Sequence, residues 1–232
     1  MNINQLFTES ATAGVVLSLI AYGAGIQLKK KTGSDAANPL LISIILCVAF
    51  LAVFHIDYES YRKSAQYLSY LLTPATVALA IPLYKQLYLL KENGKAVLIG
   101  MVSGVLASLV SVLALSVLFG LTHEDYVTLL PKSITTAIGM GVSEELGGNP
   151  TITVAVIIIT GVIGNMTAVM MSRLLRIKSP VARGLMIGTA SHAIGTAKAM
   201  EIGAIEGAMS SLAIVVCGLI TVVAASFFAM LY

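Results

Sequence analysis

Two short, polar and glycine-rich stretches, 133–143 and 184–197, contain or border the side chains best suited to binding a small anion. Their serine and threonine hydroxyl groups donate hydrogen bonds, and one lysine and one histidine add positive charge or a transferable proton. The candidate binding residues there are Lys132, Ser133, Thr135, Thr136, Gly139, Thr189, Ser191, His192, Gly195 and Thr196. Short helices that stop inside a membrane would also direct free N–H groups and partial positive charge at such an anion.

The two stretches resemble each other at a constant offset of 56 residues. Ala-Ile-Gly occurs at 137–139 and at 193–195, and after five further residues each is followed by a glutamate, Glu145 or Glu201. Inverted repeats with interrupted helices near the middle of the membrane indicate a transporter site. A structural alternative is that the small residues only let helices pack closely, which also suits the stretch 100–104.

The charged candidates each have a functional and a structural interpretation. A charge at depth in a membrane is costly and is usually functional, but the long side chain of Lys132 can instead reach the membrane surface. His192 titrates in a range that suits proton-coupled anion uptake, which makes it the candidate for proton coupling. Alternatively, its ring only donates a hydrogen bond to a neighbouring carbonyl.

A third interrupted stretch contains Thr73, Pro74 and Pro82. The two prolines remove helix donors, so this segment is either a kinked helix or an opened one that lines the same cavity. Asn38 precedes Pro39, which predicts a turn and a helix start with proline at the first helical position. We also include Asn38 among the candidate binding residues.

The elements that must position these residues are membrane helices. Of the 232 residues, 57% are hydrophobic and only 11% are charged, and the mean hydropathy is +0.93. A soluble domain has about 25% charged residues, so the sequence predicts an all-α integral membrane protein. A helix needs about 20 residues to cross the bilayer. Six uncharged stretches approach or exceed that length: 10–28, 36–54, 64–84, 97–119, 151–172 and 207–232.

Charge distribution decides between two topologies. If all eight hydrophobic pieces cross, the 14 basic residues divide seven to seven between the two faces. If 133–143 and 184–197 instead each enter and leave by one face, the division is eleven inside to three outside, as the positive-inside rule favours. The residues then assigned to the inside are Lys29, Lys30, Lys31, Lys85, Lys91, Lys95, Arg173, Arg176, Lys178, Arg183 and Lys198, and those assigned to the outside are Arg62, Lys63 and Lys132. We therefore expect about six transmembrane helices plus two re-entrant elements forming an inverted repeat, with both termini outside. Broken helices that cross the membrane remain an alternative.

We expect one transmembrane domain over 1–232, with the first four spans in 10–120 and the repeat units at 126–175 and 180–232. The small net charge of +3 gives no indication of nucleic-acid binding. Phosphate-binding loops, nucleophile elbows, zinc-protease motifs and paired cysteine motifs do not occur in the sequence, so neither an enzyme nor a cofactor or metal is expected. Cys47 and Cys217 lie in apolar spans and are interpreted as packing residues.

Four motifs, in order along the chain, resemble the LrgB/CidB family, and the likeness runs from about Val15 to Phe228. They are Asn-Pro-Leu-Leu at 38–41, Thr-Pro-Ala-Thr-Val-Ala-Leu-Ala-Ile-Pro-Leu-Tyr at 73–84, Leu-Pro-Lys-Ser-Ile-Thr-Thr at 130–136 and Gly-Thr-Ala-Ser-His-Ala-Ile-Gly-Thr-Ala at 188–197. This family is similar to the C-terminal half of the plastid glycolate/glycerate transporter.

The resemblance implies a bacterial cell-membrane protein that has a small LrgA/CidA-type membrane partner, forms an oligomer, and moves small carboxylates such as pyruvate, lactate, glycolate or glycerate. It also implies an alternative role as a holin/antiholin-like pore or pore regulator that controls murein hydrolase activity and autolysis. We expect transport by alternating access, because holin-type helices have no need of glycine-interrupted inverted elements.

Overall fold

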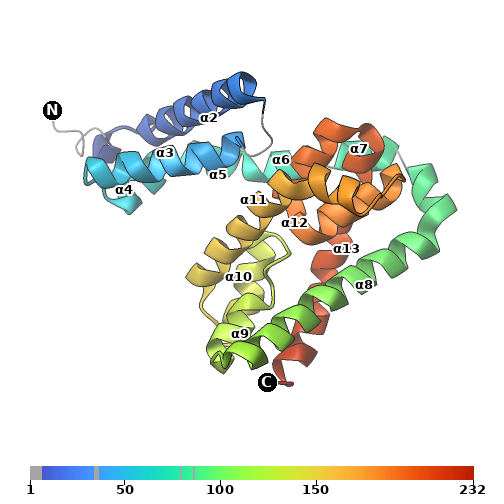
Figure 1. Ribbon diagram of the computed structural model, residues 1–232. Helices are drawn as coiled ribbons and strands as arrows, with labels where there is room; N and C mark the ends of the chain where they lie inside the picture. Colours follow the sequence, from blue (N-terminus) through green and yellow to red (C-terminus); the bar gives the residue numbers. More distant parts are fainter. Residues whose placement is uncertain (1–6, 34–36, 79, 86) are drawn as a thin grey trace. The chain divides into compact units, whose positions relative to one another are not determined.

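A computed structural model describes residues 7–33, 37–78, 80–85 and 87–232 of the chain, and the regular structure in these ranges is helical (Figure 1). The chain divides into two compact units, Met1–Ala78 and Leu79–Tyr232. Each unit is described separately below. The expectation of a single domain over the whole chain stays a prediction.

The first unit begins with its two longest helices, α2 (Ala13–Thr32) and α3 (Pro39–Val53). Three short helices follow: α4 (Tyr58–Ser64), α5 (Gln66–Tyr70) and α6 (Leu72–Ala78). Asn38 is the N-cap of α3, and its side chain accepts hydrogen bonds from the backbone N–H groups of Leu40 and Leu41 at 2.8 and 3.2 Å. With Pro39 at the first helical position, the predicted helix start is confirmed.

The predicted span 64–84 is helical over α5, α6 and α7 (Ala80–Lys85), and a turn at Leu71 separates α5 from α6, which agrees with a kinked helix. Pro74 has no N–H group and therefore cannot donate to the carbonyl of Tyr70, where α5 ends. The side chains of Thr73 and Pro82 lie outside the described residues. The predicted opening of this helix toward the cavity therefore stays a prediction.

The second unit contains three helices that are long and apolar enough to cross a membrane: α8 (Leu87–Phe119), of which Lys91–Phe119 is the candidate span, α11 (Pro150–Leu174) and α13 (Ala204–Ala229). They match the predicted spans 97–119, 151–172 and 207–232. Among the described residues of the first unit, α3 is also apolar but is shorter than these three candidate spans. The remaining helices of this unit are α7, α9 (His123–Leu129), α10 (Thr136–Glu145) and α12 (Pro180–Ile202).

Helix α12 is a hairpin of two half-helices rather than a continuous rod. His192, with φ 42° and ψ −138°, interrupts it. A Cβ atom built on Gly184 would lie 2.5 Å from the carbonyl oxygen of Glu206, and one on Gly207 would lie 2.8 Å from Cγ of Met200. In a straight helix residues 184 and 200 would be about 24 Å apart, yet both contact the first turn of α13. The second polar stretch therefore enters and leaves on one side.

Helices α9 and α10 form the corresponding hairpin, with the non-helical residues 130–135 at its tip. The hydroxyl oxygen of Thr153, near the start of α11, lies 3.0 Å from the carbonyl oxygen of Thr128 in α9 and 2.7 Å from the hydroxyl oxygen of Ser143 in α10, and it hydrogen-bonds both. The offset of 56 places Thr135, which precedes α10, on Ser191, which precedes the break in α12. The sequence repeat therefore coincides with a structural one.

The two repeat units run in opposite directions. The start of α11 lies at α9 through the Thr153–Thr128 hydrogen bond, and the end of α13 also lies at α9, where Tyr126 donates to the carbonyl of Phe228 at 2.7 Å. Tyr232 similarly donates to the carbonyl of Leu121 at 2.6 Å. Since α11 begins where α13 ends, these long helices are antiparallel and the hairpins preceding them enter from opposite ends, as an inverted repeat requires.

Close packing of α12 on α13 gives a stability prediction. A Cβ on Gly188 would lie 2.5 Å from the carbonyl oxygen of Ser210, a backbone atom that cannot rotate away. We expect Gly188→Ala to lower the free energy of unfolding by about 1–3 kcal/mol. Gly141→Ala is the matched control, because nothing lies within 4 Å of that position, and it should be neutral or stabilising by up to about 1 kcal/mol. Thermal unfolding in detergent measures both, and equal effects would contradict the packing.

Candidate functional site

Both hairpin tips of the second unit line one cavity of about 850 Å³. Lys132 and Ser133 come from the tip between α9 and α10, and Thr189, Ala190 and Ser191 come from the tip of α12. Helices α8 and α11 complete the wall with small or polar residues, among them Gly104, Ser108, Thr160 and Gly164. Four of the predicted binding residues thus meet here: Lys132, Ser133, Thr189 and Ser191.

Lys132 is held at the cavity wall by hydroxyl groups. Its ammonium donates to Oγ of Ser108 at 3.2 Å and to Oγ of Ser133 at 3.1 Å, while the two hydroxyl oxygens are 3.2 Å apart. No carboxylate pairs with Lys132 among the described residues. An ammonium has three donors, so one remains for an anion in the cavity, where its charge is not balanced by the protein.

The N-terminus of α10 lies immediately beyond this lysine. Thr135 is the N-cap, with φ −68° and ψ 148°, and its side chain makes no capping hydrogen bond. Thr136 is the first helical residue. The first N–H groups of a helix have no partner within the helix and carry partial positive charge. The tip therefore adds positive potential to that of Lys132, although neither threonine is among the residues lining the cavity.

His192 hydrogen-bonds a backbone carbonyl, as in the structural alternative given for this residue in the sequence analysis. Its buried ring lies against α11, with Nε2 3.1 Å from the carbonyl oxygen of Ile157, and it is not among the residues that line the cavity. Gly161 makes room for the ring, because a Cβ there would lie 2.8 Å from its Cε1 atom. The side-chain amide of Asn165 donates to the carbonyl of Ile194 at 2.7 Å. These contacts from α11 hold the break in place.

The other candidates lie away from the cavity. Gly139, Gly195 and Thr196 are buried in packing contacts, and Thr196 hydrogen-bonds the carbonyl of His192 at 2.8 Å and the hydroxyl of Ser210 at 2.7 Å. Both glycines are helical, so neither forms the turn; the positive φ falls on His192 instead. Asn38 caps α3, and Pro74 is an exposed residue of α6, both in the first unit.

Ser108, Asn165, Gly161 and Gly164 belong to the site and its support but were not among the sequence candidates. Asn165 had a usable signal, because an amide in the middle of a 25-residue apolar helix requires a partner. The glycines had a weaker one: Gly161 and Gly164 are spaced for one helix face, and a Cβ on Gly164 would collide with Oγ of Ser191. The close packing expected for 100–104 is present, since Gly104 abuts Thr189.

Cysteine labelling tests whether the cavity is wet and attracts anions. In a Cys47→Ser, Cys217→Ser background, Ala182→Cys and Ala190→Cys, both exposed and lining the cavity, should react with anionic thiosulfonate reagents. Ala137→Cys, exposed on α10 but outside the cavity, is the control and should react slowly. Lys132→Gln should lower the rate of the anionic reagent at position 190 by up to about fivefold, about one charge interaction in water, and so lower the anionic-to-cationic rate ratio. Equal ratios with and without Lys132 would contradict this assignment.

Comparisons with known proteins identify the family of the chain. The model of the LrgB-like family matches residues 18–231. The antiholin-like protein LrgB of Bacillus mycoides (strain KBAB4) is 40% identical over 211 residues, which cover 90% of this chain and 92% of that protein. The proteins of the same name from Bacillus cereus (strain B4264) and Bacillus anthracis (strain CDC 684 / NRRL 3495) are each 39% identical over the same shares. No solved structure matches the chain. The chain belongs to the LrgB-like family.

Proposed function

We propose that this protein moves small monocarboxylates, of the pyruvate, lactate, glycolate and glycerate class, across a bacterial cell membrane by alternating access. The observation that carries the proposal is the ammonium of Lys132, hydrogen-bonded to two serine hydroxyls, unpaired with any carboxylate of the described residues, and facing a cavity of about 850 Å³. A cation at membrane depth is unfavourable unless something balances its charge. A carboxylate substrate would do so.

The chemistry of the tip favours a carboxylate over a neutral solute. The free donor of Lys132 can bind one carboxylate oxygen, and the hydroxyls of Ser133 and Thr189 lie in the same wall for the other. The uncapped N-terminus of α10 adds partial positive charge without requiring a counter-ion. Apolar groups from Leu185 and Met186 also line the cavity and suit a short carbon chain.

The extent of the cavity supports an inward-open state. Its lining runs from Asn93 on α8 and Ser179 before α12, both near basic residues assigned to the inside, to Ser108 and Lys132. The rise from Asn93 to Ser108 along α8 is about 22 Å, which would bring water well into the membrane. In alternating access the inverted hairpins exchange roles, so the same tips would be reached from the outside in the other state. A separate LrgA/CidA-type protein is the proposed partner, and an oligomer the proposed assembly.

The antiholin-like role is the second candidate, and the names given to the relatives in Bacillus mycoides and Bacillus cereus favour it over transport. In that role the protein would regulate a pore and, through it, murein hydrolase activity and autolysis. The two candidates differ in selectivity, because a carrier saturates and discriminates among solutes of similar size whereas a pore does not.

Uptake into proteoliposomes, with and without the LrgA/CidA-type protein, tests the first candidate. Labelled pyruvate or glycolate should enter saturably, and Lys132→Gln should lower uptake at low substrate roughly tenfold to a hundredfold, the loss of a charged hydrogen bond. Lys132→Arg retains the charge and should retain part of the activity, and Lys63→Gln, an exposed lysine of the first unit, is the control. Leakage of unrelated dyes of similar size, unaffected by Lys132→Gln, would instead favour the pore.

Proton coupling at His192 is a separate part of the proposal, with its own test. Asparagine tolerates positive φ, so His192→Asn should keep the hairpin while removing the titratable ring. If His192 couples a proton, an inward proton gradient should stimulate uptake by the parent protein but not by this variant, while exchange of labelled for unlabelled substrate continues in both. Loss of both activities would assign His192 a positioning role only, and unchanged stimulation would remove it from the coupling mechanism.

A further inference from the structure

A second cavity of the second unit, about 720 Å³, lies where α11 ends and α12 begins. Four cationic side chains line it, Arg173, Arg176, Lys178 and Arg183, and its lining contains no carboxylate. Val169 and Ile202 give it an apolar side. This cavity is separate from the one at the hairpin tips and plays no part in the proposed transport.

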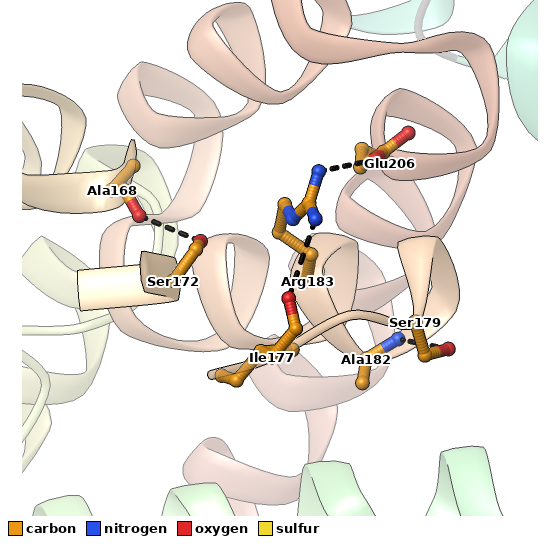
Figure 2. A network of polar contacts seen from close by, with 7 residues as sticks. All are labelled: Ala168, Ser172, Ile177, Ser179, Ala182, Arg183 and Glu206. Atoms are coloured by element: carbon orange, nitrogen blue, oxygen red, sulfur yellow. Dashed lines mark hydrogen bonds and ion pairs between the residues drawn. The ribbon is translucent and has the colours of Figure 1, made fainter. Parts of the chain in front are cut away.

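Arg183 is fixed in the wall and its charge is balanced. Figure 2 shows its guanidinium between Glu206 and the backbone of Ile177: Nη1 lies 3.2 Å from Oε1 of Glu206, and Nη2 donates to the carbonyl of Ile177 at 3.3 Å. The side chain of Glu206 is only 8% exposed, so this pair is largely shielded from water. The nearby hydroxyl of Ser172 donates to the carbonyl of Ala168 at 2.8 Å, which leaves its oxygen as an acceptor only.

The other three cations are not balanced. No carboxylate pairs with the side chains of Arg173, Arg176 or Lys178 within the described ranges. Arg176 also occupies the left-handed position that ends α11, with φ 53°, where the next residue's N–H bonds the carbonyl of Ser172 at 2.9 Å. Glycine is favoured at such a position because it carries no Cβ. An arginine there is unfavourable for the fold and holds a third positive charge at the cavity.

We propose that this cavity binds a phosphate group. Three uncompensated cations exceed what a monocarboxylate requires, and arginine guanidinium groups match the tetrahedral oxygens of phosphate with paired N–H donors. The ligand is either the headgroup of an anionic phospholipid or a soluble phosphate ester. The position favours the lipid, since the cluster follows the last turn of a membrane-spanning helix on the face assigned to the inside, and basic pockets there bind anionic headgroups. Val169 and Ile202 would then contact the glycerol and upper acyl chain.

The binding is measured on the purified full-length chain in phosphatidylcholine nanodiscs, by thermal unfolding and by lipid retention in native mass spectrometry. Phosphatidylglycerol should raise the unfolding temperature and be retained, whereas added phosphatidylcholine should do neither. sn-Glycerol 3-phosphate is the second arm: stabilisation by the lipid alone identifies a headgroup site, and stabilisation by the soluble ester as well identifies a general phosphate site. Stabilisation by neither overturns the proposal.

Matched variants separate the cavity from general charge. The triple variant R173Q/R176Q/K178Q should bind phosphatidylglycerol about a hundredfold more weakly, roughly fivefold for each charge. K29Q/K30Q/K31Q removes the same charge from a cluster assigned to the same face and should change binding little. Arg176→Gly should unfold at the same or a higher temperature without ligand, because it relieves the left-handed position, yet bind more weakly. Unchanged affinity in the first triple variant or in Arg176→Gly, or an equal loss in the lysine variant, overturns the proposal.

Discussion

The structure of the second unit depends on satisfying backbone groups where helices stop inside the membrane. Helix α12 turns at His192 and the first hairpin turns over 130–135, and each interruption leaves N–H and C=O groups without helical partners. In hydrocarbon such groups are costly, so irregular backbone persists only where protein or water satisfies it. At α12 the protein does so: the hydroxyl of Thr196 donates to the carbonyl of His192, and the side-chain amide of Asn165 donates to the carbonyl of Ile194.

The same constraint explains why the cavity and the break occur together. Gly161 and Gly164 let α11 approach the tip of α12, and Gly104 lets α8 approach it, so the tip is supported on two sides. The polar side chains of Lys132, Ser133, Thr189 and Ser191 line the cavity, where water or a ligand can bind them. The unpaired ammonium of Lys132 follows this logic, because its charge is tolerable only beside a hydrated or anion-occupied space. The proposed transport thus rests on the features that allow the hairpins to exist.

Sequence reasoning predicted the architecture of this unit better than it predicted the site. The 56-residue offset and the charge count predicted two re-entrant, inverted elements, and the packing of Gly184 and Met200 on the start of α13 confirms the hairpin at α12. A repeat of this kind can be recognised in the sequence because both copies form the same backbone geometry. The positive φ at the break in α12 belongs to a buried histidine whose ring is anchored to α11, and not to one of the glycines of that stretch.

It was harder to predict which residues line the cavity, because this depends on which face of each hairpin turns toward α8 and α11. Residue type placed Thr196 and Ser191 together, yet Thr196 bonds Ser210 and lies buried against α13, whereas Ser191 lines the cavity. Ser108 was missed since a serine in an apolar span has many ordinary uses, and only the position of Lys132 identifies its partner. Asn38 shows the opposite outcome: the helix-start interpretation of Asn-Pro is confirmed by its capping bonds.

The central claim is that a carboxylate lies against the ammonium of Lys132 when the hairpin tips are occupied. Dipolar recoupling by solid-state nuclear magnetic resonance, with ¹³C in the carboxylate of pyruvate and ¹⁵N in the lysine side chains of the chain in lipid bilayers, measures this contact directly. The account predicts one lysine nitrogen within about 3–4 Å of the labelled carbon, with the signal absent in Lys132→Arg. A bound carboxylate with no dephasing, or dephasing that persists in that variant, would contradict it.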